Sequence, residues 1–196
     1  MAKINRKYID KHWVVFILRS VLAGVFGLLL LFGGPTDMEN VMVEISIFLL
    51  MMGIIDSVSA LYNSTKKRGW FNSVIDAGID IVAAVVLLFF AKNNLATSVA
   101  ILSVYTLLSG VIDVFHGFLS TVDPTDRFIR VLAGMCGCVV GIVILNAGNL
   151  EISTFIRFFG TYMLIVGVTS AIYGVHNRSQ NIEDKVARKQ SRKKKK

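Results

Sequence analysis

Apolar and polar residues alternate along this chain on the scale of whole helices. Because a hydrocarbon core about 30 Å thick is crossed by about 20 helical residues, an apolar stretch of that length predicts a membrane span. Six such stretches occur, separated by short polar segments, at residues 13–33, 40–62, 70–91, 95–119, 128–148 and 151–175. We therefore expect an all-α, polytopic membrane protein with six transmembrane helices.

The second, fourth and sixth predicted helices carry the same short pattern at a constant spacing of 57 residues. The three segments are FLLMMGIIDSVSA at 48–60, YTLLSGVIDVFHG at 105–117 and YMLIVGVTSAIYG at 162–174. Residues three or seven apart share one face of a helix, so each segment predicts a narrow seam of small residues with a polar group in it. The aligned positions are Gly53, Gly110 and Gly167 for helix packing, and Asp56, Asp113 and Ser170 for the polar group.

The first, third and fifth predicted helices repeat as well, though less tightly. Trp13 and Trp70 are 57 residues apart, and VLAGVFG at 21–27 returns as VLAGMCG at 131–137. The pattern thus predicts three tandem helical hairpins, which close into one bundle because a hairpin cannot bury its own inner face. The predicted repeats cover about 13–63, 70–120 and 128–177, between a basic N-terminal segment at 1–12 and a disordered basic tail at 178–196.

Composition supports a membrane protein and excludes a soluble core. The chain is 54% hydrophobic and 17% charged, with a mean hydropathy of +0.64, which is outside the range of soluble domains. The net charge of +8 comes largely from the chain ends, since the tail after His176 contains nine Lys and Arg. We expect no nucleic-acid surface. We expect instead that the tail contacts anionic lipids, at about 1 kcal/mol for each charge near the membrane.

Positive charge alternates between successive loops and so predicts an orientation. The loop after the second span contains Lys66, Lys67 and Arg68, and the loop after the fourth contains Arg127, whereas the first and fifth loops contain no Lys or Arg. Positive residues are retained on the cytoplasmic side of spans. The sequence therefore predicts that both termini are cytoplasmic and that the protein resides in the inner (plasma) membrane.

Ionisable residues inside the spans are the candidate functional residues. A charge near the bilayer centre costs about 2.5–3.5 kcal/mol on insertion scales, so something must offset it. Counted from the cytoplasmic helix ends, these residues lie at similar depths, with Asp80 deeper, and Arg19 and Arg130 are the expected counter-ions. The predicted polar layer consists of Arg19, Asp56, Asp76, Asp80, Asp113, Arg130 and Ser170.

Two interpretations of this layer remain open. In the first, it is an interior network of ion pairs and hydrogen bonds that fixes helix register and does nothing else. In the second, at least one of the four aspartates takes up a proton on acidification. Asp76 and Asp80 are one helical turn apart, where two carboxylates favour each other's protonation. His116, on the same face as Asp113, could join them.

The sequence carries no enzyme motif: it has no phosphate-binding loop, HExxH, dinucleotide fingerprint or Cys-Cys-His metal spacing. Cys136 and Cys138 point to different faces of a helix, which argues against a shared metal. We therefore expect no catalytic residues, cofactor or metal. Gly137 and Gly141 form a GxxxG pattern, which packs either inside the bundle or against a second copy of the chain or another membrane protein.

The repeating unit begins at an interfacial Trp, runs through a glycine-containing helix to a short Pro or Asn turn, and returns through L-x-x-G-[IV]-x-[DS]. Over residues 13–177 it resembles the HdeD family of bacterial acid-resistance membrane proteins. The Gly and Asp/Ser positions of the three seams carry the resemblance. The third repeat departs from it, because Ser170 replaces the acid and Phe128 stands near the expected Trp, and the tail is unusually basic.

The resemblance implies a small, non-enzymatic inner-membrane protein that aids tolerance of acid or envelope stress. The residues themselves leave an alternative, a channel or carrier that moves protons or a small solute along the Asp and Arg layer. A wide polar path through the bundle would favour transport. A dry core in which every carboxylate is paired would favour a structural role.

Overall fold

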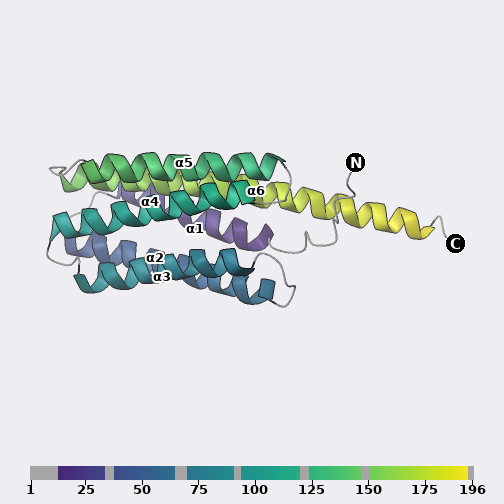
Figure 1. The fold of residues 1–196 in the computed structure, drawn as a ribbon, viewed down its shortest axis with the longest axis horizontal. Coiled ribbons are helices and arrows are strands. Elements are labelled where there is room, and N and C mark those ends of the chain that lie inside the picture. The colour runs from purple at the N-terminus through teal and green to yellow at the C-terminus, as the bar shows by residue number, and fades with distance from the viewer. Residues whose placement is uncertain are drawn as a thin grey trace.

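The computed structural model describes residues 13–33, 38–64, 70–90, 94–119, 124–146 and 151–193. These residues form six helices, each long and apolar enough to cross a membrane. The all-α, six-span fold class is therefore confirmed. The helices, shown in Figure 1, are α1 (Trp13–Phe32), α2 (Met38–Ser64), α3 (Trp70–Phe90), α4 (Leu95–Leu119), α5 (Pro124–Asn146) and α6 (Ile152–Lys193).

The starts of α5 and α4 have local causes in the sequence. α5 begins at Pro124, four residues before the predicted start at 128, because proline suits the first turn, where its missing N–H would have no helical partner. Before α4, the side chain of Asn94 accepts a hydrogen bond from the backbone N–H of Thr97 at 3.3 Å. Asn94 is thus an N-cap that sets the start of this helix.

The end of α6 differs more. The sequence predicts a disordered tail from residue 178, whereas the structure continues α6 as a helix to Lys193. The stretch after His176 contains no Gly or Pro within the helix. Lengthening an existing helix adds one hydrogen bond per residue without a new nucleation step, so the charged tail extends a helix that the membrane span has already formed.

The most extensive helix contacts join neighbouring repeats. α2 packs on α3, α4 on α5, and α6 closes the arrangement by packing on α1, whereas α1 and α2, α3 and α4, and α5 and α6 contact each other less. Figure 1 shows α2 and α3 side by side as one such pair. Each helix therefore contacts its neighbours along the chain, and the first helix contacts the last.

The repeated glycines lie where these pairs approach most closely. A Cβ atom on Gly53 would lie 3.2 Å from the backbone oxygen of Ala77 on α3, and one on Gly110 would lie 2.6 Å from that of Gly134 on α5. The third glycine, Gly167, stands in the same relation to Ser20 on α1, at 3.2 Å. Since a side chain at these positions would meet backbone, the glycines allow the helices to approach closely.

The GxxxG pattern on α5 packs inside the bundle. A Cβ atom on Gly137 would lie 3.1 Å from the Cα atom of Gly110, and one on Gly141 would lie 2.7 Å from the side chain of Leu107. Both contacts are with α4, and both glycines are buried. This pattern therefore joins two helices of one chain and does not supply a surface for a second copy.

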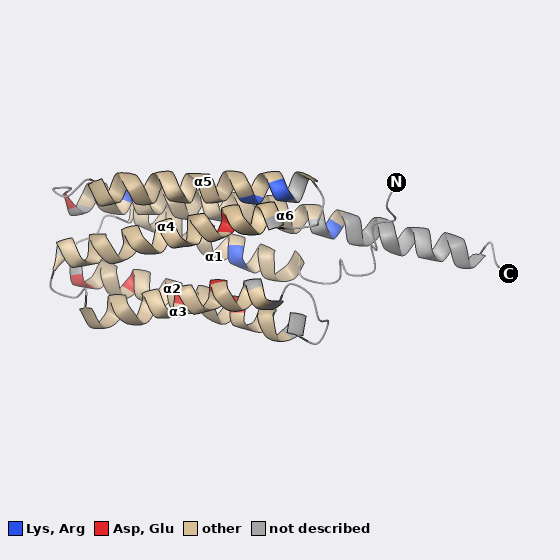
Figure 2. Ribbon diagram, in the orientation of Figure 1, with Lys and Arg blue, Asp and Glu red and all other residues tan. Residues whose placement is uncertain are grey.

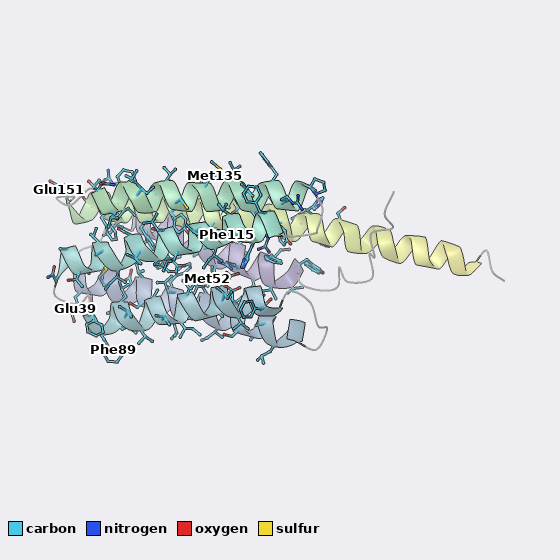
Figure 3. All side chains as sticks on the ribbon, in the orientation of Figure 1. Glu39, Met52, Phe89, Phe115, Met135 and Glu151 are labelled. Atoms are coloured by element: carbon cyan, nitrogen blue, oxygen red, sulfur yellow. The ribbon has the colours of Figure 1, made fainter. Side chains whose placement is uncertain are left out.

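The even-numbered helices are the more buried ones, and the outer surface is apolar. Half of the α2 span is buried, compared with 22% of the α1 span. Figure 3 shows Phe89 at the outer edge of the bundle, pointing away from it. The side chains of Phe89, Phe115 and Met135 are 78%, 60% and 56% exposed. An exposed apolar surface of this kind suits contact with lipid tails in a chain with six spans.

Both ends of the membrane domain lie at the same end of the bundle. The guanidinium of Arg178, beyond the sixth span, lies 5.1 Å from the ring centroid of Trp13, where the first helix begins. Figure 1 shows the start of α1 and the end of α6 on the same side. We call this the terminal end. Figure 3 shows Glu39 and Glu151 at the opposite end.

Candidate functional site

The predicted polar layer lies in the half of the bundle nearer the terminal end. Arg19 and Asp76 are six residues into α1 and α3, and Asp113 is six residues before the end of α4, so each lies about 9 Å from a helix end at 1.5 Å per residue. Asp80 is the middle residue of α3. Figure 2 shows that charged residues are sparse in the rest of the bundle, apart from its opposite end.

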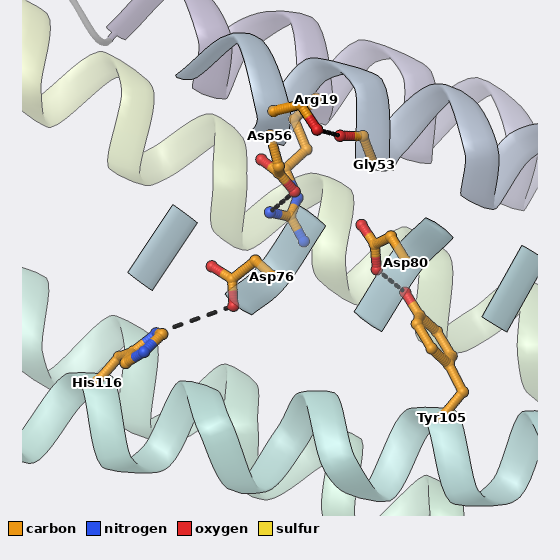
Figure 4. A network of polar contacts seen from close by, with 8 residues as sticks. Arg19, Gly53, Asp56, Asp76, Asp80, Tyr105 and His116 are labelled. Carbon is orange, nitrogen blue, oxygen red and sulfur yellow. Dashed lines mark hydrogen bonds and ion pairs between the residues drawn. The ribbon is translucent and has the colours of Figure 1, made fainter. Parts of the chain in front are cut away.

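One ion pair joins the first two helices. Arg19 Nη1 donates a hydrogen bond to Asp56 Oδ2 at 2.8 Å, and the Asp56 side chain is 8% exposed (Figure 4). The buried Nε of Arg19 has no hydrogen-bond partner among the described residues. Removing either partner of a buried pair leaves an uncompensated charge, so this contact fixes α1 against α2.

A tyrosine binds the deepest acid of the layer. The hydroxyl of Tyr105 on α4 donates to Asp80 Oδ1 on α3 at 2.9 Å, as Figure 4 shows, and both residues are buried. The second oxygen, Asp80 Oδ2, is buried without a hydrogen-bond partner in the described part of the chain. Asp80 is thus half satisfied, and a buried acceptor left in this state costs about 1–3 kcal/mol.

Asp76 has a weaker contact. The Nδ1 atom of His116 lies 3.9 Å from Asp76 Oδ1, which is too long for a hydrogen bond. Figure 4 shows this imidazole pointing from α4 towards Asp76 on α3. The histidine is buried, and its Nδ1 has no hydrogen-bond partner within the described residues. His116 therefore belongs to the layer, as the sequence allowed.

A small cavity lies between these side chains. Its volume is about 10 Å³, close to the minimum that one water molecule needs. Three carboxylates and one guanidinium from three helices thus share a single water-sized space. The residues that line it are Arg19, Asp76, Ile79, Asp80, Ser109 and Asp113.

Arg130 and Ser170 stand apart from this cavity. The guanidinium of Arg130 lies 4.8 Å from the ring centroid of Tyr173, a cation–π contact, and no ion pair joins it to an acid among the residues that the structure describes. Its direct contact is therefore with the Tyr173 ring, and its role as a counter-ion of the layer stays a prediction. Ser170 on α6 is half-buried.

Sequence reasoning missed Tyr105 as a partner of Asp80, although the repeat contained a signal. Tyr105 follows Asp80 by 25 residues, and Tyr162 follows Gly137 by the same number. A Cβ atom on Gly137 would lie 3.3 Å from the ring of Tyr162, so the two positions face each other in the third repeat as they do in the second. Ser109 and Tyr173 were missed without a comparable signal.

The layer contains more acids than bases. With four aspartates ionised, two arginines charged and His116 neutral, its charge is 2 − 4 = −2. No group of three or more His, Cys, Asp or Glu residues in the described ranges is placed to hold a metal ion. The chemistry available here is hydrogen bonding and the binding of a small positive species.

Comparison with known proteins finds one segment of the chain that is similar to a described family. Residues 75–146, which include Asp76, Asp80, Asp113 and Arg130, match the model of a family described as a short repeat of unknown function, DUF308. No curated protein and no solved structure matches the chain. The protein is thus a polytopic membrane protein, and its residues 75–146 are similar to the DUF308 repeat, the family to which HdeD belongs.

Proposed function

We propose that this chain is a small, non-enzymatic integral membrane protein of the HdeD type that contributes to tolerance of acid or envelope stress. The observation that carries the proposal is the excess of aspartates over arginines in the polar layer, together with the Oδ2 atom of Asp80, which has no hydrogen-bond partner among the described residues. The absence of enzyme motifs in the sequence supports a role without catalysis.

Proton uptake is the chemistry that links this layer to acid stress. An excess negative charge inside the membrane is unfavourable, and protonation neutralises a carboxylate without bringing another ion into the interior. The pairs Arg19–Asp56 and Tyr105–Asp80 account for helix register. Register alone leaves Asp76 unexplained, since its contact with His116 is too long for a hydrogen bond.

Acid-shock survival tests the proposal. A deletion strain would receive the wild-type protein or Asp80→Asn, with membrane levels matched by immunoblotting. We expect the wild type to restore survival and Asp80→Asn to lose most of that protection, because the amide keeps the shape of the side chain but cannot be protonated. If the wild type does not protect, the stress role is wrong. If both protect equally, Asp80 takes no part in it.

The orientation belongs to the same proposal. We place the terminal end in the cytoplasm of an inner (plasma) membrane, because Arg127 lies in the first turn of α5 at that end, and the sequence between α2 and α3 contains Lys66 to Arg68. A C-terminal fusion to an enzyme that acts only outside the cytoplasm should therefore be inactive. Activity of that fusion would place both termini outside.

A channel or carrier for protons or a small solute is the second candidate. It is favoured by the cavity between Arg19, Asp76 and Asp113 within the spans, since intramembrane ionisable residues often mark ion pathways. It is disfavoured by the cavity's size and by the fully buried apolar Leu87 and Leu102 of α3 and α4. Reconstituted vesicles that acidify no faster than empty liposomes would exclude proton transport.

A further inference from the structure

The 57-residue repeat relates an ion pair in the first repeat to a pair of acids in the second. Adding 57 to Arg19 gives Asp76, and adding 57 to Asp56 gives Asp113. The packing follows this spacing, because Gly53 meets Ala77 as Gly110 meets Gly134. Asp76 and Asp113 are therefore the counterparts, between α3 and α4, of the two residues that form the ion pair between α1 and α2.

Both acids lie at one place in the structure. Asp76 and Asp113 line the same cavity. At the equivalent positions of the first repeat, Arg19 and Asp56 lie 2.8 Å apart. The third repeat has Ala133 and Ser170 at these positions. One interface thus occurs in three forms: an ion pair, a pair of acids and a neutral pair.

A third acid that lines the cavity has an oxygen atom without a hydrogen-bond partner in the described part of the chain. Asp80 lines the cavity, is 3% exposed, and has its Oδ2 buried without a hydrogen bond among the described residues. With three aspartates and Arg19 charged, the lining would carry 1 − 3 = −2. A ligand that satisfies this site must be positive and no larger than about one water molecule.

We propose that this cavity is a proton-binding site, in which one excess proton is held between Asp76 and Asp113 through a single water, with Asp80 as a third acceptor. The inference deepens the proposed function, on which it rests. A hydronium ion at the terminal end gives up its proton and becomes water, and the proton forms an O–H bond on one carboxylate. A metal ion fits less well, because no described group of acids is placed to coordinate one.

The charged and titratable neighbours do not remove the need for this proton. Arg19 on α1 is engaged by Asp56 of α2, and Arg130 on α5 lies on the ring of Tyr173 of α6. The remaining titratable groups near the cavity are His116, which faces Asp76, Tyr105, which is bound to Asp80, and, from α5 and α6, Cys138 and Tyr162.

The repeat itself supplies the variants that test the site. Asp76→Arg gives the second repeat the ion pair of the first, and Asp113→Ser gives it the serine of the third. Asp76→Asn serves if the arginine variant does not fold, as judged by helicity and size-exclusion chromatography. Glu44→Gln is the matched control, because Glu44 is an exposed acid near the other end of α2.

Proton uptake by the purified full-length protein would be measured by pH-stat between about pH 7 and about pH 4, with infrared difference spectra of the carboxylic C=O stretch. We expect each variant to take up about one proton per chain fewer than the wild type, because coupled carboxylates bind protons in separate steps. The infrared band of the buried carboxylic acid should be lost in the variants and kept in the control.

Full retention of the carboxylic acid band in Asp76→Arg and Asp113→Ser would contradict the proposed proton-binding site. Proton release from the wild type on addition of sodium chloride, at constant ionic strength, would also overturn it in favour of a cation site. If the band behaves as expected while acid-shock survival does not depend on the protein, the site stands and the stress function fails. If survival depends on the protein but the band is absent, the site fails and the function stands.

Discussion

Asp80 is an acid at a position where the other two repeats have none. The equivalent residues are Ala23 and Gly137, both of which can be buried without an unsatisfied polar atom. In the second repeat the hydroxyl of Tyr105 satisfies Oδ1 of Asp80, which lines the cavity, and Oδ2 has no hydrogen-bond partner among the described residues. Because a buried oxygen without a partner is unfavourable, Asp80 lowers stability relative to its counterparts. Its presence is therefore better explained by ligand binding than by packing.

Replacing Tyr105 by Phe tests this account of Asp80. The variant leaves both carboxylate oxygens without a partner, so we expect the free energy of unfolding to fall by about 1–3 kcal/mol. The double variant Asp80→Ala/Tyr105→Phe recreates Ala23 and Phe48 of the first repeat and should recover most of that loss. Unfolding by SDS titration in mixed micelles measures both. A single variant as stable as the wild type would show that the hydrogen bond does not contribute.

Much of the site could be predicted from the sequence, but its partners could not. Counting residues from Trp13 and Trp70 gives the depth of Arg19 and Asp76, because helical rise is constant. The rotation of each helix about its axis is set by packing with its neighbours, which the sequence does not state. For this reason the sequence did not indicate the contact of Arg130 with the ring of Tyr173.

Helix pairing shows what a repeat does and does not specify. The 57-residue period identifies the unit, but a period has no starting point, so α1 with α2 and α2 with α3 are equally valid hairpins. The structure packs the second kind more closely. The glycine seams decide this, since Gly53 and Gly110 face the helix that follows and not the one that precedes.

Alanine substitutions separate seam glycines from lipid-facing ones. A Cβ on Gly134 would lie 2.5 Å from the backbone oxygen of Gly110, so Gly134→Ala forces α5 away from α4. We expect this variant to lose about 1–3 kcal/mol of stability, as overpacked interiors do. Gly78→Ala is the control: nothing lies within 4 Å of its Cβ, and alanine in a helix should be neutral or stabilise by up to about 1 kcal/mol.

Thermal unfolding in detergent, monitored by circular dichroism, shows which of these two variants is the more stable. Equal midpoints for Gly134→Ala and Gly78→Ala would mean that the close approach of α4 and α5 contributes no stability. The comparison is informative because both glycines are helical and both changes add one methyl group. The two sites differ in that Gly134 is buried, with backbone where the methyl group must go, whereas Gly78 is exposed with open space there.

At the scale of the whole molecule, the contact between α1 and α6 makes the bundle a closed ring. The two helices pack as extensively as the other two close pairs, and Gly167 meets Ser20 as Gly110 meets Gly134. Trp13 and Arg178 lie beside each other. The break in the chain between them is therefore only one of three similar places at which this ring could be opened.

Circular permutation tests that closure. A short flexible linker from residue 179 to residue 13, with new termini between residues 65 and 69, gives the order α3, α4, α5, α6, α1, α2 and keeps both termini at the terminal end. We expect it to insert and fold with a stability within about 1 kcal/mol of the wild type, because loop-closure entropy changes slowly with loop length.

The control permutant, opened between residues 147 and 150, has the same helix contacts but places its termini at the opposite end. It should insert poorly, since its first helix must then cross in the reverse sense while the basic loops stay in place. If the first permutant aggregates as readily as the control, α1 and α6 require their own chain ends to pair, and the ring is not closed by packing alone.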